Sequence, residues 1–292
     1  MIDSKQYQKG RKVLEALGFN PVEARHAQDR WMLFAGEDEA RADDINRAFA
    51  DKSIDAIICL RGGAGTARLL PLIDFALIKR NPKILIGYSD ITALQLAILA
   101  KTGLVTFYGP MVTTDMGHNW TRFSHESLFD TLTRVNGDAE ARLERRQKTI
   151  TLCPGEAAGR LVGGCLSIVV STLGTEWEID TRKKILFLED IDERPHRVDR
   201  YLTQLHLAGK LQAARGFLFG SFSRCDYPPG DEHHSLGVRT RDIIKAWARR
   251  LGKPCLAGVQ FGHVAEKITM PIGGQAFMDA TEQRILLSPS VR

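Results

Sequence analysis

The chain has 292 residues, 43% of them hydrophobic and 26% charged, which are ordinary values for a globular protein of one large or two smaller domains. Its 40 basic and 35 acidic residues leave a net charge of +5. No basic stripe with interleaved aromatic residues occurs, so nucleic acid is not an expected partner.

Helix and strand patterns alternate along the first half of the chain. Helices are expected at 5–17, 38–50 and 91–99, and strands at 20–24, 54–60, 84–86 and 104–108. This alternation predicts a parallel, doubly wound sheet. The loops at 61–66 and 88–90, which follow two of its strands, would then face one crevice, where ligands bind in such sheets.

The second half has a different pattern. Short apolar runs separated by turn residues recur at 161–170, 185–188, 216–222, 255–261 and 285–287, with helical patterns at 197–207 and 240–251. They predict a β-rich α/β domain rather than another regular βαβ array. We therefore expect a first domain at 1–135, a linker at 136–156 and a second domain at 157–292.

The cysteine pattern and the apolar runs indicate where the protein resides. Five widely separated cysteines without a CxxC pair predict free thiols in a reducing compartment. The sequence has no signal-peptide pattern, and its longest uncharged apolar stretch, 161–175, is shorter than the roughly 20 residues of a bilayer span. We expect a cytoplasmic protein without a membrane partner.

Ser89 follows the strand predicted at 84–86 in a strand–turn–helix pattern. Gly87 is expected to supply the backbone angles of the tight turn. Such a turn would expose the Ser89 hydroxyl and direct the backbone N–H groups of the helix start at a ligand, as a nucleophilic serine requires. A plain helix N-cap is the alternative, because serine is favoured at that position.

The glycine-rich loop at 61–66 follows another predicted strand. It lacks the Lys-Ser/Thr pair of a P-loop, and Arg68 holds the place of the third glycine of a dinucleotide fingerprint, so no nucleotide cofactor is expected. Its glycines would instead let the backbone approach Ser89 and supply an N–H donor for an oxyanion. A tight turn without such a role is the alternative.

Glu189 and His263 each end an apolar strand of the second half. A carboxylate at a buried strand end can orient a histidine, and histidine is the usual general base near neutral pH. A surface acid at the end of a strand is the alternative for Glu189. His233 and His234 are adjacent in a polar loop, but no HExxH pattern or spaced third ligand accompanies them, so no metal is expected.

The chain resembles the L,D-carboxypeptidase family of serine peptidases, which includes muropeptide L,D-carboxypeptidases and microcin-immunity peptidases. The resemblance spans nearly the whole chain in the order of the family's motifs. The matching segments are Arg61-Gly-Gly-Ala-Gly, Ile86-Gly-Tyr-Ser-Asp-Ile-Thr-Ala-Leu, Thr106-Phe-Tyr-Gly-Pro-Met, Gly163-Gly-Cys-Leu-Ser, Leu188-Glu-Asp-Ile-Asp-Glu, Arg197-Val-Asp-Arg with Leu202-Thr-Gln-Leu, Phe261-Gly-His-Val and Met270-Pro-Ile-Gly.

The resemblance implies a Ser–Glu–His triad made by Ser89, Glu189 and His263. It implies an oxyanion hole formed by the N–H of Asp90 and one from the glycine loop, assigned to Gly63. It also implies a flavodoxin-like first domain, a β-rich second domain, a homodimer and no cofactor. The implied substrate is the tetrapeptide stem of murein, from which a terminal D-alanine is removed in the cytoplasm.

A carboxypeptidase must also bind the terminal carboxylate of its substrate. Arg61 at the start of the glycine loop is the candidate, through bidentate pairing, with a structural salt bridge as the alternative. The resemblance allows an immunity-type peptidase that hydrolyses peptidyl or aminoacyl nucleotides, for which Trp177 or Tyr227 would be the aromatic platform. A non-catalytic binding protein on the same fold is the remaining alternative.

The sequence departs from the family pattern at three places. The family's first domain starts with a strand before an Ala-Pro-Ser-like turn, and this chain starts at about that turn, so we expect a sheet without that strand. Cys165 stands where the family typically has asparagine, and Ala64 where an aromatic residue is common. Both positions are expected near the site, so the substrate preference is expected to differ.

Overall fold

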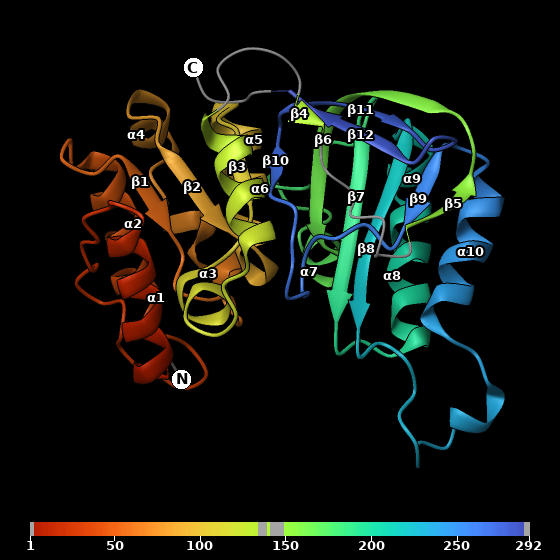
Figure 1. Cartoon of the computed structure of the whole chain (residues 1–292), viewed down its shortest axis with the longest axis horizontal. Helices are drawn as coiled ribbons and strands as arrows, with labels where there is room; N and C mark the ends of the chain where they lie inside the picture. Colours follow the sequence, from red (N-terminus) through yellow and green to blue (C-terminus); the bar gives the residue numbers. More distant parts are fainter. Residues whose placement is uncertain (1–2, 134–138, 141–148, 289–292) are drawn as a thin grey trace.

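A computed structural model describes residues 3–133, 139–140 and 149–288 of the chain. Two sheets lie side by side, the first built mainly from the amino-terminal half and the second from the carboxy-terminal half (Figure 1). None of the described helices combines the length and the apolar character that a bilayer span requires.

The first sheet has the order β1-β2-β3-β10. Its first three strands are parallel, and β10 pairs antiparallel with β3. The strands are β1 (Ala56–Ile58), β2 (Ile84–Gly87), β3 (Thr106–Tyr108) and β10 (Met270–Ile272). Because β10 comes from the second half of the chain, the two halves share this sheet (Figure 1).

Helices cover both faces of the first sheet, because successive strand residues point to opposite sides. Leu85 packs in a cluster with Phe49 and Ile78, whereas Ile86 packs in another with Tyr7 and other residues. The helical elements of this half are α1 (Ser4–Ala16), α2 (Asp38–Ala50), α3 (Thr66–Leu69), η1 (Leu70–Leu72), α4 (Phe75–Arg80), η2 (Ser89–Ile91), α5 (Thr92–Thr102), the π-helical η3 (Val112–Met116) and α6 (Arg122–Thr133).

The second sheet has the order β4-β12-β11-β6-β7-β8-β9-β5. Its strands are β4 (Ala139–Glu140), β5 (Ile150–Cys153), β6 (Glu156–Cys165), β7 (Ile185–Ile191), β8 (Gly216–Ser223), β9 (Cys255–Ala257), β11 (Gln275–Asp279) and β12 (Arg284–Leu287). The helical elements are α7 (Leu166–Ser171), α8 (Pro195–Leu207), α9 (Lys210–Ala213), η4 (His234–Leu236) and α10 (Thr240–Leu251).

The predicted mixed α/β architecture is confirmed, with one correction in the second half. The four central strands β6 to β9 are mutually parallel and are connected through helices, so they do form a regular βαβ array. The antiparallel strands flank this array. The apolar runs predicted at 161–170, 185–188, 216–222 and 255–261 contain the central parallel strands, and buried parallel strands have such continuous apolar sequences. The run predicted at 285–287 lies in the antiparallel β12.

Several predicted boundaries also change. The helices predicted at 38–50 and 240–251 have those bounds in the structure. The strand predicted at 54–60 is reduced to β1, and the one predicted at 20–24 does not form. Pro21 cannot donate to a strand ladder and Val22 is 69% exposed, so that segment has no buried face to stabilise it.

The predicted linker at 136–156 contains β4 and β5, both of which belong to the second sheet. Its residues 136–138 and 141–148 lie outside the described part of the chain. Within residues 3–55 the structure has two helices and an isolated bridge between Trp31 and Phe34, and no strand of the first sheet. The domain boundaries themselves stay a prediction.

Candidate active site

Ser89 is the first residue of η2, and Tyr88 separates it from the end of β2 in a strained turn before α5. Its φ of +67° is a left-handed backbone angle that residues other than glycine rarely adopt. The expectation that Gly87 supplies the turn angle is wrong, since its φ is not positive. Gly87 is needed for space instead: a Cβ there would lie 3.0 Å from the Cys59 Sγ. A strained serine between a strand and a helix is the geometry of a nucleophile elbow.

Ser89 is not a helix N-cap. Tyr88 occupies the N-cap position of η2, without a side-chain capping bond. The Ser89 hydroxyl oxygen lies 3.1 Å from Nε2 of His263. The N-cap alternative for Ser89 is therefore wrong, because its side chain is directed at a histidine from the other half of the chain.

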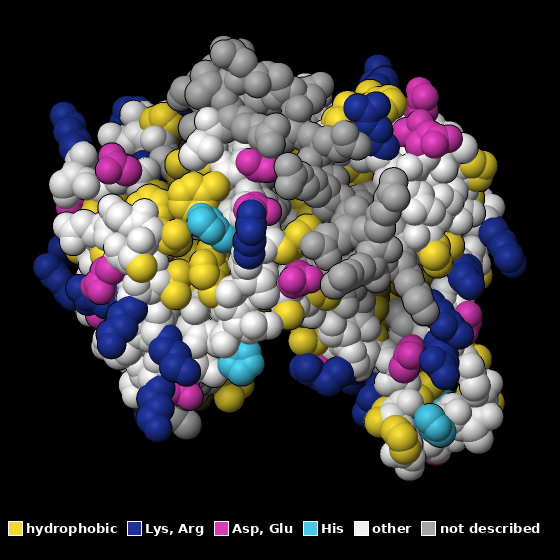
Figure 2. Space-filling model, in the orientation of Figure 1, with side chains coloured by type: hydrophobic (Ala, Val, Ile, Leu, Met, Phe, Trp, Pro, Cys, Tyr) yellow, Lys and Arg dark blue, Asp and Glu magenta, His cyan; other side chains and the backbone are white. Residues whose placement is uncertain are grey.

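His263 and Glu189 meet Ser89 at the contact between the two halves. The His263 Nδ1 lies 2.8 Å from the Glu189 Oε2, and the same oxygen accepts the His263 backbone N–H at 3.1 Å. The Glu189 side chain is fully buried, so it is not the surface acid of the alternative interpretation. The structure thus brings the three predicted residues into one hydrogen-bonded row. Figure 2 shows the surface notched between the two halves, on the side toward which β7 and β8 point in Figure 1.

Gly262 makes room for the Glu189 carboxylate. It has a φ of +87°, and a Cβ at this position would lie 2.3 Å from the carboxyl carbon of Glu189. No side chain fits there without moving that carboxylate.

The Gly262→Ala variant is expected to lower kcat by about 100-fold, because displacing a reacting group by about 1 Å has an effect of that size. Gly18→Ala is the matched control: Gly18 has a φ of +86°, and nothing lies within 4 Å of its Cβ position. Steady-state kinetics of both variants measures the effect. Equal activity of the two variants would show that the contact with Glu189 is unimportant.

The glycine loop approaches Ser89 through a residue that the sequence analysis did not single out. A Cβ at Gly62 would lie 2.8 Å from Cβ and 3.0 Å from Oγ of Ser89. Gly63 next to it has a φ of +132°, and its Cβ position borders open space. The Asp90 carboxylate accepts the Thr66 N–H at 2.8 Å and hydroxyl at 2.6 Å, which ties the end of the loop to the serine turn.

Arg61 is exposed at the start of the glycine loop. Its role at a terminal carboxylate stays a prediction. The oxyanion roles of the Asp90 and Gly63 N–H groups likewise stay predictions.

A buried ion pair supports the histidine loop from the other side. Lys267, 2% exposed, pairs with Asp115, and its ammonium lies 4.0 Å from the centre of the Tyr88 ring. The Tyr88 ring in turn packs edge-on against the His263 ring, with centroids 5.0 Å apart. Burial lowers the pKa of Lys267, and Asp115 opposes that shift. This pair was not predicted, because nothing in the local sequence indicates that residues 115 and 267 meet.

Cys165 lies beside Glu189 in the parallel pairing of β6 and β7. Its thiol is 3.4 Å from Oδ1 of Asp190, a buried carboxylate that also accepts the Ser167 N–H at 2.8 Å. Burial raises the pKa of Asp190 to about 6. The thiol therefore contacts a polar network directly behind Glu189, and its influence on substrate preference stays a prediction.

The other candidates lie outside this row. In the loop that follows β8, His233 stacks on Tyr227, which also stacks on His196 at the start of α8. In the described part of the chain no group of three or more His, Cys, Asp or Glu side chains is placed to hold a metal ion. Trp177 is half-buried against the core of the first half.

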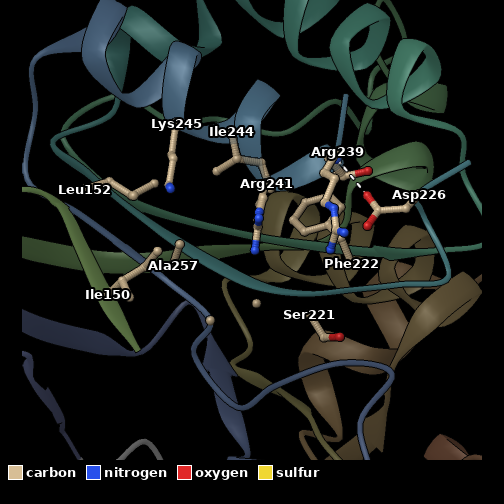
Figure 3. A pocket seen from close by; sticks show the side chains of 13 residues that line it. Ile150, Leu152, Ser221, Phe222, Asp226, Arg239, Arg241, Ile244, Lys245 and Ala257 are labelled. Carbon is tan, nitrogen blue, oxygen red and sulfur yellow. Dashed lines mark hydrogen bonds between the residues drawn. The ribbon is translucent and has the colours of Figure 1, made fainter. Parts of the chain in front are cut away.

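A separate cavity lies between β5, β8, β9 and the start of α10 (Figure 3). Its volume is about 370 Å³, and its lining includes Arg239, Arg241 and Lys245 beside apolar residues such as Ile150 and Leu152. It contains none of the three residues of the hydrogen-bonded row.

Comparison with known proteins identifies the family. Residues 1–109 match the LD-carboxypeptidase N-terminal domain, and residues 158–278 match the LD-carboxypeptidase C-terminal domain. The chain is also 40% identical over 294 residues to the probable murein peptide carboxypeptidase of Bacillus subtilis (strain 168), covering 99% of this chain and 89% of that protein. This chain belongs to the LD-carboxypeptidase family, and this membership supports a serine-type carboxypeptidase, which is a hydrolase.

Solved structures agree with this membership. The muramoyltetrapeptide carboxypeptidase from Oxalobacter formigenes has a TM-score of 0.82 and 30% identity, covering 98% of this chain and 94% of that one. The microcin C7 self immunity protein MccF in complex with aspartyl sulfamoyl adenosine has a TM-score of 0.89 and 26% identity, covering 99% and 92%.

Proposed function

We propose that the chain is a serine-type L,D-carboxypeptidase that removes the terminal D-alanine from murein tetrapeptides in cell-wall recycling. The proposal rests on the row of contacts from the Ser89 Oγ to the His263 Nε2, at 3.1 Å, and from the His263 Nδ1 to the Glu189 Oε2, at 2.8 Å. The similarity to a probable murein peptide carboxypeptidase and to a muramoyltetrapeptide carboxypeptidase supports the choice of substrate.

In this mechanism the Ser89 Oγ attacks the carbonyl carbon before the terminal D-residue, while His263 Nε2 takes the hydroxyl proton. The negative oxygen that forms is held by the N–H groups of Asp90 and Gly63. His263 then donates the proton to the leaving amine, and Glu189 stabilises the charged imidazole meanwhile. Water, deprotonated by His263, hydrolyses the acyl-enzyme and restores Ser89.

The test compares two tetrapeptides that differ only in the chirality of the terminal alanine. We expect free D-alanine from the D-terminated murein tetrapeptide and no alanine from its L-terminated counterpart. Arg61→Gln is expected to raise KM more than it lowers kcat, since Arg61 would bind the carboxylate and not the reacting atoms. Equal release from both peptides would contradict the proposed specificity.

A second candidate substrate is an aminoacyl or peptidyl nucleotide. The similarity to the immunity protein solved with aspartyl sulfamoyl adenosine supports it. The stack of Tyr227 on His233 and on His196 of α8 also supports it, because it offers an aromatic face to a base. Turnover of an aminoacyl sulfamoyl adenylate measured beside that of the murein tetrapeptide separates the two. A larger kcat/KM for the adenylate would favour this candidate.

The proposal extends to the location and assembly of the protein. We place the reaction in the cytoplasm, where recycled stem peptides would be the substrate, and expect a homodimer of chains divided at 1–135 and 157–292. Sedimentation of the purified protein at several concentrations measures the assembly, and a mass of one chain throughout would contradict the dimer.

A further inference from the structure

Tyr108 lies in the motif 106–111, to which the proposed mechanism gives no role. It is the last residue of β3 and pairs with Gly87 on β2, so it lies beside the serine turn. Its side chain is 1% exposed and extends across the contact between the two halves of the chain. A buried hydroxyl in that place requires partners.

The Tyr108 hydroxyl has two hydrogen-bond partners, and both belong to the site. It donates to the Glu189 Oε1 at 2.6 Å and accepts the backbone N–H of Ser89 at 3.1 Å. The directions of both bonds are determined, because a backbone N–H can only donate and an ionised carboxylate can only accept. Glu189 therefore binds His263 through one oxygen and Tyr108 through the other.

Aromatic rings hold Tyr108 in this orientation. Its ring packs edge-on against Tyr88 at 5.9 Å and against Phe187 at 5.4 Å. Phe187 is itself packed edge-on against Phe261 at 5.3 Å. These contacts fix the orientation of the Tyr108 ring, so its hydroxyl is held in one place and can position the groups that it binds.

We propose that Tyr108 is a positioning residue that joins the orienting carboxylate to the nucleophile's own backbone. Its hydroxyl orients Glu189 toward His263 and holds the strained Ser89 through the Ser89 N–H. Because that N–H is engaged by Tyr108, it is not an oxyanion donor, and this role is left to Asp90 and the glycine loop. Burial and the nearby Glu189 raise the pKa of Tyr108 well above its usual range, so the hydroxyl stays protonated.

Loss of the Tyr108 hydroxyl is expected to change the pH dependence of the rate at which Ser89 reacts. The Tyr108 donor withdraws negative charge from Glu189, so without it the Glu189–His263 pair binds a proton more tightly. A general base that keeps its proton at higher pH moves the acid limb of the rate profile upward. A residue with a purely structural role would lower the rate without moving that limb.

The inference rests on the proposed nucleophile Ser89, and its experiment measures the pH-dependent labelling rate of Ser89 by a fluorophosphonate, which needs no peptide substrate. Tyr108→Phe is expected to slow labelling about 10- to 100-fold, the range for a lost bond to a charged group, and to move the acid limb to higher pH. Tyr7→Phe is the matched control: Tyr7 is also buried, and its hydroxyl bonds Glu23 away from the site.

A second variant retains both the tyrosine ring and its hydroxyl. Incorporating 3-fluorotyrosine at position 108 makes the hydroxyl a stronger donor, so the acid limb is expected to move to lower pH. The role of Tyr108 would be overturned if the acid limb stayed in place in both variants. It would also be overturned if the limb moved to lower pH in Tyr108→Phe and to higher pH in the fluorinated variant. Labelling of the wild-type protein without D-alanine release would instead contradict the proposed substrate alone.

Discussion

Replacing Ser89 by alanine is expected to lower kcat for D-alanine release by at least about 10⁴-fold, because no other group can form the acyl-enzyme. Substrate binding is expected to stay close to the wild-type value, since the hydroxyl contributes to the bond-breaking step and not to the ground-state complex. Labelling by a fluorophosphonate is expected to vanish with the hydroxyl.

The fold is expected to tolerate this change. The left-handed φ of +67° strains the backbone of alanine about as much as that of serine. The lost hydrogen bond to His263 contributes about 1 kcal/mol to stability. Ser171→Ala is the matched control, because this exposed serine at the end of α7 only bonds the Ile168 carbonyl. Activity of Ser89→Ala equal to that of the control would refute Ser89 as the nucleophile.

Replacing Lys267 by methionine is expected to reduce the free energy of unfolding by about 3–5 kcal/mol, the range for removing one partner of a buried ion pair. The change leaves the Asp115 carboxylate, 6% exposed, without its cation, although the carboxylate still accepts the Met111 N–H at 2.8 Å. We also expect kcat to fall, because the loop that carries His263 is attached to the first half of the chain through this pair.

Urea unfolding of Lys267→Met, Asp115→Asn and the double variant measures the coupling between the two side chains. The double variant is expected to lose less than the sum of the single losses, because neither charge is then left buried alone. The surface pair Lys101–Glu176, with side chains 32% and 63% exposed, is the control, and Lys101→Met is expected to change stability by less than about 1 kcal/mol. If Lys267→Met and Lys101→Met lowered the free energy of unfolding equally, the buried pair would not be the stronger contributor to stability.

Local patterns in the sequence determined much of the fold. The helices at 38–50 and 240–251, and the strand before Ser89, follow from hydrophobic periodicity and turn chemistry, which depend on neighbours along the chain. The same patterns singled out Glu189 and His263, but the strand ends predicted for them are wrong. Glu189 lies inside β7, which continues to Ile191, and His263 lies in a loop six residues after β9 ends at Ala257. The patterns also overestimated the strands at 20–24 and 54–60, because propensity does not report whether a partner strand is present.

Only the tertiary structure decided which of the candidate residues meet. Ser89 and His263 are 174 positions apart, Tyr108 and Glu189 are 81 apart, and Asp115 and Lys267 are 152 apart. The left-handed angle lies at Ser89 and not at Gly87, where a Cβ would come within 3.0–3.2 Å of the Cys59 and Ile91 side chains, and these tertiary contacts could not be anticipated from the local sequence. A hydrophobic pattern indicates which face of a segment is buried but not what covers it, so contacts between distant segments emerge only when the two halves pack together.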